Sequence, residues 1–142
     1  MKSNYYFKFE DLQVYQKAIA FGELVNKQID SFPKHEMYRL SSQFIRAADS
    51  IAFNIAEGSG STDTNFNRYL KMAWDSAHEC VAVSTKARLR GYITFQEDEE
   101  NRKMVTEISK MISALRRHLN NKSGIVINRM ISLTSHLYKT HH

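Results

Sequence analysis

Asp75, His78 and Glu79 are the residues whose types and spacing come nearest to a metal site. Asp75 lies three residues before His78 and four before Glu79, so either pair can share one face of a helix. Helical bundles that hold two metal ions repeat such a carboxylate–histidine pair on a second helix, and the chain has no second pair of that spacing. We therefore interpret the three as ordinary helix residues and expect no metal or cofactor.

The sequence motifs of nucleophilic enzymes and of phosphate-binding loops are also incomplete. Cys80 falls in an apolar stripe, which favours a small core residue over a reactive thiol. Ser41, Ser42 and Ser50 lack the strand-to-helix elbow of serine hydrolases. The stretch 58–60, Gly-Ser-Gly, has neither a preceding strand nor a following Lys. The sequence therefore predicts a protein that is not an enzyme, and its single Cys fits a reducing compartment.

Asn54, Glu57 and Arg68 form the polar set that we single out. Asn54 and Glu57 close one helical stretch, and Arg68 opens the next. Consecutive helices joined by a short turn run antiparallel, so we expect Glu57 and Arg68 to pair and to fix register. Gly58 is expected to end the first of these helices in a left-handed conformation. The set is either architectural or part of a binding groove, and spacing alone does not choose.

The elements that would position these residues are four predicted helices. Helical spacing predicts them over about residues 11–30, 36–57, 62–90 and 94–120. Within the second, the apolar positions Phe44, Ala48, Ile51 and Ile55 mark one face. Pro33 and Gly91 are the expected stops. The fold class predicted is all-α, an up-down-up-down four-helix bundle.

The last 20 residues are expected to form a separate unit. Residues 121–124, Asn-Lys-Ser-Gly, predict a break in the fourth helix. Beyond it, Val126, Met130, Leu133 and Leu137 keep a heptad-like spacing that allows a short C-terminal fifth helix. We therefore divide the chain into a bundle domain, residues 1–122, and a basic C-terminal tail, residues 123–142.

Positive charge is concentrated at the C-terminal end. The net charge is +5, yet residues 101–142 hold eight Lys or Arg against one acid, Glu107, which is a net of +7. Such a segment attracts phosphate backbones, although a solvated basic face would look the same. No apolar run approaches the roughly 20 residues that span a bilayer, and the N-terminus has no signal-peptide core. We expect a soluble, cytoplasmic protein.

Five motifs together resemble one known family. They are Ser50–Ile51 with Asn54–Gly58, Phe9–Ala18, Phe32–Lys34 with Glu36, Arg68–Leu70 with Glu79, and Gly91–Ile93. In this order and spacing the chain resembles the four-helix bundle family of the 23S rRNA intervening-sequence protein (S23-type), over about residues 7–120. Ala52, Phe53 and Asp75 stand where the family commonly has Pro, a small residue and Gly. The resemblance marks Asn54, Glu57, Arg68 and Glu79 as family-signature polar residues.

The resemblance also implies an assembly and partners. Proteins of this kind form cyclic homo-oligomers, pentamers in the family, with a central channel. A related bundle is the accessory protein of diversity-generating retroelements, which binds nucleic acid and a reverse transcriptase. A homopentamer, RNA or DNA, and a reverse transcriptase are therefore the expected partners, with no membrane.

Our leading hypothesis combines the charge with this resemblance. The chain is expected to be a non-enzymatic oligomeric bundle that binds RNA or other nucleic acid through a basic surface. The candidate nucleic-acid-binding residues are Lys103, Lys110, Arg116, Arg117, Lys122 and Arg129. The alternative is a protein–protein interaction scaffold whose basic face meets an acidic partner and binds no nucleic acid.

Overall fold

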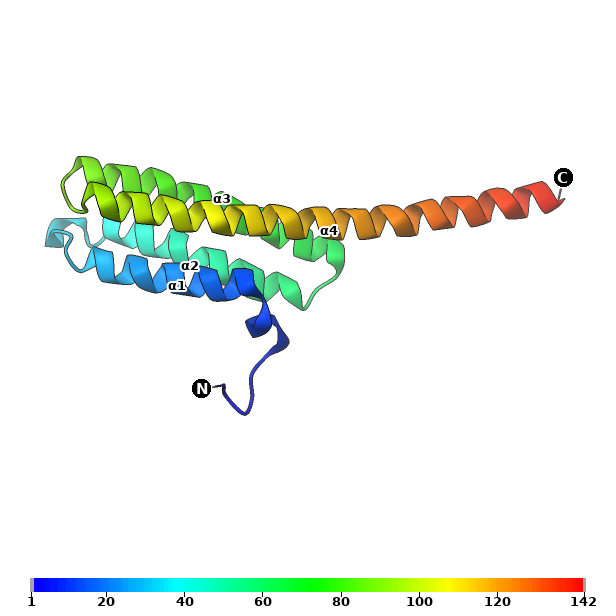
Figure 1. Ribbon diagram of the computed structural model, residues 1–142, viewed down its shortest axis with the longest axis horizontal. Helices are drawn as coiled ribbons and strands as arrows, with labels where there is room; N and C mark the ends of the chain where they lie inside the picture. Colours follow the sequence, from blue (N-terminus) through cyan, green and yellow to red (C-terminus); the bar gives the residue numbers. More distant parts are fainter. Residues whose placement is uncertain (1, 142) are drawn as a thin grey trace.

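A computed structural model describes the backbone of residues 2–141 and the side chains of residues 2–122. Its four α-helices are α1 (Gln13–Ile29), α2 (Leu40–Ser59), α3 (Asp63–Leu89) and α4 (Phe95–His141), and two short 3-10 helices are η1 (Lys8–Asp11) and η2 (Lys34–Glu36) (Figure 1). Residues 2–141 contain no β-strand. The all-α prediction is therefore confirmed, and the first three predicted helices are close to the observed ones.

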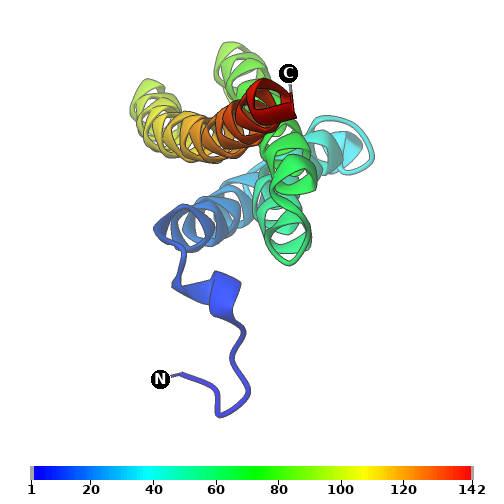
Figure 2. The same cartoon turned by 90° about the vertical axis from the view of Figure 1, so that its right-hand side faces the viewer.

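The helices run antiparallel in sequence order. α2 packs against both α1 and α3, and α4 closes the bundle by packing against α3 and α1. Figure 2, which looks along the helices, shows the four of them around one interior. The short turns leave each helix beside the one that precedes it, so the up-down-up-down topology is confirmed (Figure 1).

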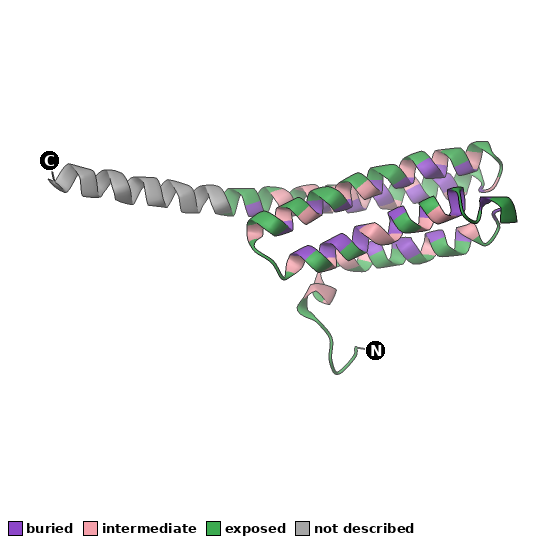
Figure 3. Ribbon diagram, turned by 180° about the vertical axis from the view of Figure 1, so that it is seen from behind, coloured by how far each residue is buried: buried purple, intermediate pink, exposed green. Residues whose placement is uncertain are grey.

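The interior is built from the predicted apolar faces. Phe44, Ala48, Ile51 and Ile55 of α2 are all 0% exposed, and Val14, Ala18, Phe21 and Val25 of α1 follow the same spacing of four, three and four residues. Figure 3 shows buried positions, in purple, recurring along the helices of the bundle. Burying each large aliphatic or aromatic side chain contributes about 1.5–3 kcal/mol, so these faces supply most of the favourable energy of folding.

Local signals in the sequence set the helix ends. Pro33 precedes η2 in an extended conformation and separates α1 from α2. Thr62 caps α3 by accepting a hydrogen bond from the Asn65 amide at 3.2 Å. Gly91 follows α3 with a φ of 77°, a left-handed conformation in which glycine avoids the steric cost of a side chain. The helix ends at Pro33 and Gly91 agree with the sequence prediction.

Gly58 differs from its prediction. It lies inside α2, which continues to Ser59, and among residues 2–141 only Gly91 has a positive φ. A Cβ built at Gly58 would stand 2.6 Å from the Cβ of Tyr69 on α3. Gly58 is therefore required for the close approach of two helices. Because Gly58 lies near the end of the helix, the sequence indicated a helix-ending role and did not indicate this close contact.

The predicted break at residues 121–124 is not observed. α4 passes through these residues and continues as one helix to His141. The expected fifth helix is thus a continuation of the fourth. The division of the chain into a bundle domain and a tail remains a prediction.

Polar side chains inside the bundle connect three helices. The amide groups of Gln28 on α1 and Asn101 on α4 exchange hydrogen bonds of 2.8 and 2.9 Å. Asn101 also donates to the hydroxyl of Ser84 on α3 at 2.9 Å. All three residues are at most 5% exposed. Because buried polar groups cost free energy when they lack partners, this set fixes the relative heights of α1, α3 and α4.

A buried carboxylate continues the same set. Asp98 of α4 is 1% exposed and accepts a 2.7 Å hydrogen bond from Ser84. The Nε atoms of Arg88 and Arg102 each lie 3.0 Å from its second oxygen. Asp98 belongs to an acidic run, residues 97–100, in the first turns of α4, where the helix dipole favours negative charge. That reason does not explain Asp98, which joins α3 to α4 through a buried ion pair.

Candidate nucleic-acid interface

Three of the predicted cations form one row on α4. Lys103, Lys110 and Arg117 are exposed and lie seven residues apart. Seven residues rise about 10.5 Å and return to nearly the same face of a helix. We call these three residues the α4 stripe. A regular row of cations on an open face can contact successive phosphates of a nucleic-acid strand.

Arg116 and Lys122 have a different position. The Nε of Arg116 donates to the Asn67 side-chain oxygen at 2.8 Å, and the Lys122 ammonium lies 3.6 Å from Asp63. Both contacts hold α4 against the beginning of α3. These two cations are therefore partly engaged within the protein, unlike the stripe. Arg129, the sixth candidate, lies outside the described side chains.

A groove between α3 and α4 runs beside the stripe. Its volume is about 840 Å³, and its lining includes Trp74, His78, Lys110 and Arg117. The rings of Trp74 and His78 lie 3.6 Å apart between centroids, and the Lys71 ammonium lies 5.0 Å from the Trp74 ring. Aromatic rings beside cations are the combination that binds single-stranded nucleic acid, because bases stack on rings while phosphates meet the charges.

One acid near the stripe is already paired. Glu107 lies 2.7 Å from the Lys17 ammonium of α1. That hydrogen bond, with the charges of Lys17, Lys103 and Lys110, holds the pKa of Glu107 below its ordinary value. Glu107 is the one acid in residues 101–122. This part of α4 therefore carries a net positive charge, although the exposed Glu99 and Glu100 lie one helical turn before Lys103.

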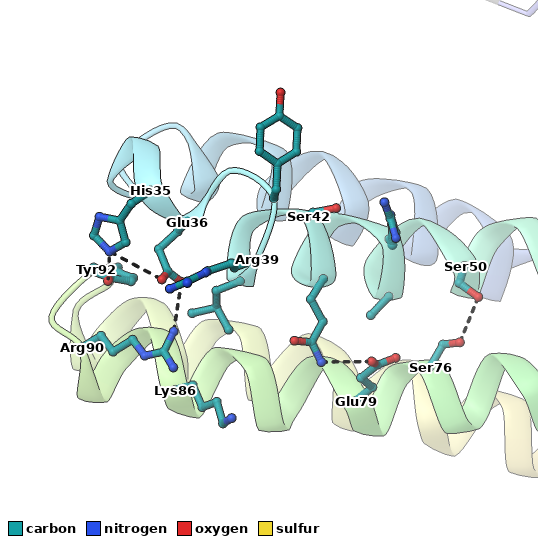
Figure 4. A pocket seen from close by; sticks show the side chains of 15 residues that line it. His35, Glu36, Arg39, Ser42, Ser50, Ser76, Glu79, Lys86, Arg90 and Tyr92 are labelled. Carbon is teal, nitrogen blue, oxygen red and sulfur yellow. Dashed lines mark hydrogen bonds and ion pairs between the residues drawn. The ribbon is translucent and has the colours of Figure 1, made fainter.

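A second groove lies on another side of α3, between α3 and α2. It has a volume of about 950 Å³, and four cations contribute to its lining: Arg39, Arg46, Lys86 and Arg90. Figure 4 shows side chains of both helices meeting across it. This groove was not predicted from the sequence. Its cations belong to two separate segments, with Arg39 in the turn before α2 and Arg90 in the turn after α3, so no single helical spacing marks it.

The residues considered for metal binding and catalysis do not converge. Asp75 pairs with Lys71, and His78 contacts the Trp74 carbonyl at 2.9 Å. In the part of the chain that the structure describes, no three His, Cys, Asp or Glu side chains are grouped to hold a metal ion. Cys80 is buried, and burial, with Glu79 and Asp49 nearby, raises its pKa to about 12. Such a thiol is protonated at neutral pH and is a poor nucleophile.

Comparison with known proteins gives a family. The family model described as "23S rRNA-intervening sequence protein" matches residues 10–114, which is most of the bundle. The chain belongs to the 23S rRNA-intervening sequence protein family. The resemblance found in the sequence is thereby confirmed.

A solved structure supports the fold assigned to this family. A protein of unknown function from the S23 ribosomal protein family of Bacteroides thetaiotaomicron is similar to this chain with a TM-score of 0.67 and 24% identity. The match covers 73% of this chain and 95% of that one. No curated protein matches the chain. The structural likeness shows a shared fold.

The signature residues Asn54 and Glu79 occupy the α2–α3 side of the bundle. Asn54 is buried, and its amide donates to the Ser50 carbonyl and hydroxyl at 2.8 and 2.9 Å. Ser50 in turn lies 2.9 Å from the Ser76 hydroxyl, which bridges the two helices (Figure 4). Glu79 accepts a hydrogen bond from Gln43 at 3.3 Å. Asn54 thus supports an interhelix contact, while Ser50, Ser76 and Glu79 line the α2–α3 groove.

The predicted ion pair between the other two signature residues is not observed. Within the described side chains, Glu57 forms no salt bridge with Arg68 and instead accepts a 3.5 Å hydrogen bond from the Tyr69 hydroxyl. Arg68 lies over the Tyr69 ring, 5.5 Å from its centroid. Tyr69 separates the two charges because it packs directly on Gly58. The prediction was therefore wrong, and Tyr69 is the residue that links Glu57 to Arg68.

Proposed function

We propose that this protein is a non-enzymatic, oligomeric four-helix bundle of the cytoplasm that binds RNA or another nucleic acid through the α4 stripe. The observation that carries the proposal is the row of Lys103, Lys110 and Arg117 beside the aromatic pair of Trp74 and His78. In the described residues, no helix has an apolar stretch that would cross a membrane.

Self-association is proposed on the family resemblance. Three large apolar side chains are available to a neighbouring subunit: Phe53 is 62% exposed, Leu89 72% and Phe95 64%, on α2, α3 and α4 respectively. Single exposed apolar residues also occur on monomers. A homo-oligomer, a pentamer as the family resemblance implies, would cover such residues. A reverse transcriptase partner follows from the resemblance alone and remains a prediction.

Salt-dependent binding of a mixed-sequence single-stranded RNA tests the nucleic-acid proposal. Lys103→Ala, Lys110→Ala and Arg117→Ala combined should weaken binding for all sequences alike. The slope of log affinity against log salt should fall by about 2, because each lost phosphate contact removes about 0.7 on a single strand. Fluorescence anisotropy over a salt series measures both quantities.

A matched variant controls for net charge. Lys8→Ala, Lys27→Ala and Lys34→Ala remove the same number of charges from exposed positions on η1, α1 and η2. This variant should bind RNA nearly as the wild type does. Equal weakening by both triple variants would contradict a defined stripe. Absence of RNA binding in the wild type would favour the scaffold alternative, in which an acidic protein meets the same face.

Light scattering on a sizing column tests the assembly. An oligomer of about five subunits that takes up RNA at low salt and releases it at moderate salt is the expected result. A monomer would contradict the oligomeric part of the proposal, whatever the RNA result.

A further inference from the structure

The α2–α3 groove is a cationic concavity with few neutralising groups. Its four cations face two acids in the lining, Glu36 and Glu79. Glu36 is 3% exposed and bonds Arg90 at 2.9 Å and His35 at 3.5 Å. Among the described side chains, Arg39, Arg46 and Lys86 form no salt bridge although they line the same groove. Three cations are thus free to bind an anion from solution.

Arg90 is held in place for such a ligand. Its Nη1 atom donates a hydrogen bond to the buried Glu36 carboxylate, while the rest of its guanidinium is available to the groove. A guanidinium fixed by one carboxylate loses less conformational entropy when it binds a second anion. Glu36 therefore positions a cation as well as neutralising part of its charge.

The groove is bridged at one end. The Tyr92 hydroxyl lies 3.4 Å from the His35 ring nitrogen, which joins the α3–α4 turn to η2 (Figure 4). The Arg90–Glu36 ion pair makes a second bridge at the same end. A continuous strand would have to pass over these contacts, whereas the end of a phosphate chain would not.

The cations line the groove from two sides. Arg46 lies on α2 and Arg39 in the turn that precedes it, while Lys86 lies on α3 and Arg90 directly follows that helix. Cations that approach from two sides can surround a compact group of high charge. Arginine prefers phosphate oxygens, because its planar fork makes two parallel hydrogen bonds to them.

We propose that the α2–α3 groove binds a compact oligophosphate group, of the kind carried by a nucleoside triphosphate or by the 5′ end of an RNA. Arg39 and Arg46, before and within α2, and Lys86 and Arg90, within and directly after α3, hold the phosphate oxygens. Tyr38, which is 90% exposed at the groove, and Tyr92 lie where the rest of the ligand would leave the phosphate site. The inference does not depend on RNA binding by the α4 stripe, because the two surfaces use different residues.

Calorimetric titration of the full chain with sodium tripolyphosphate tests the inference. One site per protomer is expected, with orthophosphate binding at least about tenfold more weakly because it fills fewer of the contacts. Arg39→Gln combined with Arg46→Gln should lower tripolyphosphate affinity at least about tenfold. Both side chains are exposed, so circular dichroism should show an unchanged fold.

Two controls separate this site from general charge and from the stripe. Lys8→Gln with Lys27→Gln removes the same charge elsewhere and should change tripolyphosphate affinity by less than about twofold. The α4-stripe triple variant should also retain that affinity while it loses RNA. No tripolyphosphate binding, or equal weakening by the two Gln pairs, would overturn the inference.

Two further ligands distinguish a free nucleotide from an RNA end as the source of the phosphate group. Adenosine triphosphate that binds as tightly as tripolyphosphate would support a free nucleotide. Tighter binding of a 5′-triphosphate RNA than of the same RNA with a 5′-hydroxyl, in the stripe variant, would support an RNA end. If neither adenosine triphosphate nor the 5′-triphosphate RNA binds as tightly as tripolyphosphate, the inference that the groove binds a phosphate chain of a nucleotide or an RNA is overturned.

Discussion

α3 packs against its two neighbours in different ways. Against α4 it uses directional polar contacts, in which Ser84 and Arg88 bind the buried Asp98. Against α2 it uses small residues, with Gly58 under Tyr69 and a contact between the hydroxyls of Ser50 and Ser76. The first interface fixes the register of the helices through charge. The second brings helix backbones close together, and the longer cationic side chains at its edge then surround a groove.

The difference also separates the two proposed binding surfaces. The α4 stripe is a straight row of cations on an open helix, whose position relative to α3 depends on the Asp98 contacts. The α2–α3 groove is a concavity whose cations come from two closely packed helices and the turns that adjoin them. A row fits a strand and a concavity fits a compact anion, so each interface favours a different shape of phosphate ligand.

Among the variants that test the two interfaces, Asp98→Ala should reduce the free energy of unfolding most. It removes the buried partner of Arg88 and Arg102 and leaves the Ser84 hydroxyl without its acceptor. We expect the free energy of unfolding to fall by about 3 kcal/mol, the usual cost of breaking a buried ion pair. Urea denaturation measures it. Glu99→Ala, at an exposed neighbouring position, should change stability by less than about 0.5 kcal/mol.

The same carboxylate should make the α3–α4 interface sensitive to acid. Burial alone would raise the pKa of Asp98, but hydrogen bonds from Ser84 and Arg102 and the charges of Arg102 and Arg88 outweigh it and leave the pKa below its ordinary value. A lowered folded-state pKa stabilises the fold fully above the unfolded pKa of about 3.9. That stabilisation is lost as the pH falls through the folded-state value.

Thermal unfolding from neutral pH into strong acid measures this loss. The loss from this group should be smaller than that of the alanine variant, because a protonated carboxyl keeps its volume and some hydrogen bonds. Asp98→Asn should have a weaker acid dependence than the wild type. An identical pH profile in the two proteins would show that Asp98 does not carry the effect.

Gly58→Ala probes the other interface. The added methyl group would meet Tyr69 at 2.6 Å, so α2 and α3 must separate or Tyr69 must move. Overpacking of this kind costs about 1–3 kcal/mol, of which better helix propensity returns up to about 1 kcal/mol. A net loss of about 1–2 kcal/mol is expected in urea. Gly60→Ala, where a Cβ would meet nothing within 4 Å, is the matched control. A neutral Gly58→Ala variant would refute the close-packing argument.

Trp74→Leu should produce the smallest of these effects. It keeps an apolar side chain in the α3–α4 groove but removes the ring on which a base would stack. RNA affinity should fall roughly fivefold, about 1 kcal/mol, the lower end for one stacked base. Tripolyphosphate affinity should not change. Loss of both affinities would mean that the two surfaces are not independent.

Much of the fold could be predicted because its signals are local. The spacing of Phe44, Ala48, Ile51 and Ile55 identified a buried face, and Pro33 and Gly91 marked helix ends. The α4 cations could be named from the sequence alone, since they all fall within the last 42 residues, where Lys and Arg greatly outnumber acids. Their division into a free stripe and the anchored Arg116 and Lys122 required knowledge of which α3 residues lie opposite.

Apart from the break expected at residues 121–124, which α4 passes through, the failures concern contacts between helices. The expected pairing of Glu57 with Arg68 assumed a register that Tyr69 and Gly58 determine through packing. Asp98 could not be distinguished from its three acidic neighbours, because only the fold brings Arg88 beside it. The α2–α3 groove could not be predicted for the same reason, since its cations come from two separate segments of the chain. A sequence pattern does not determine the axial register of two packed helices.

The position of Trp74 gives the protein an internal optical label. It is the only tryptophan in the chain, and it stacks on His78 in the groove beside the α4 stripe. The α2–α3 groove is lined instead by tyrosines. Indole emission responds to changes within contact distance, so a strand that enters one groove should alter the fluorescence and an anion that enters the other should not. Unmodified protein can thus report which side of α3 is occupied.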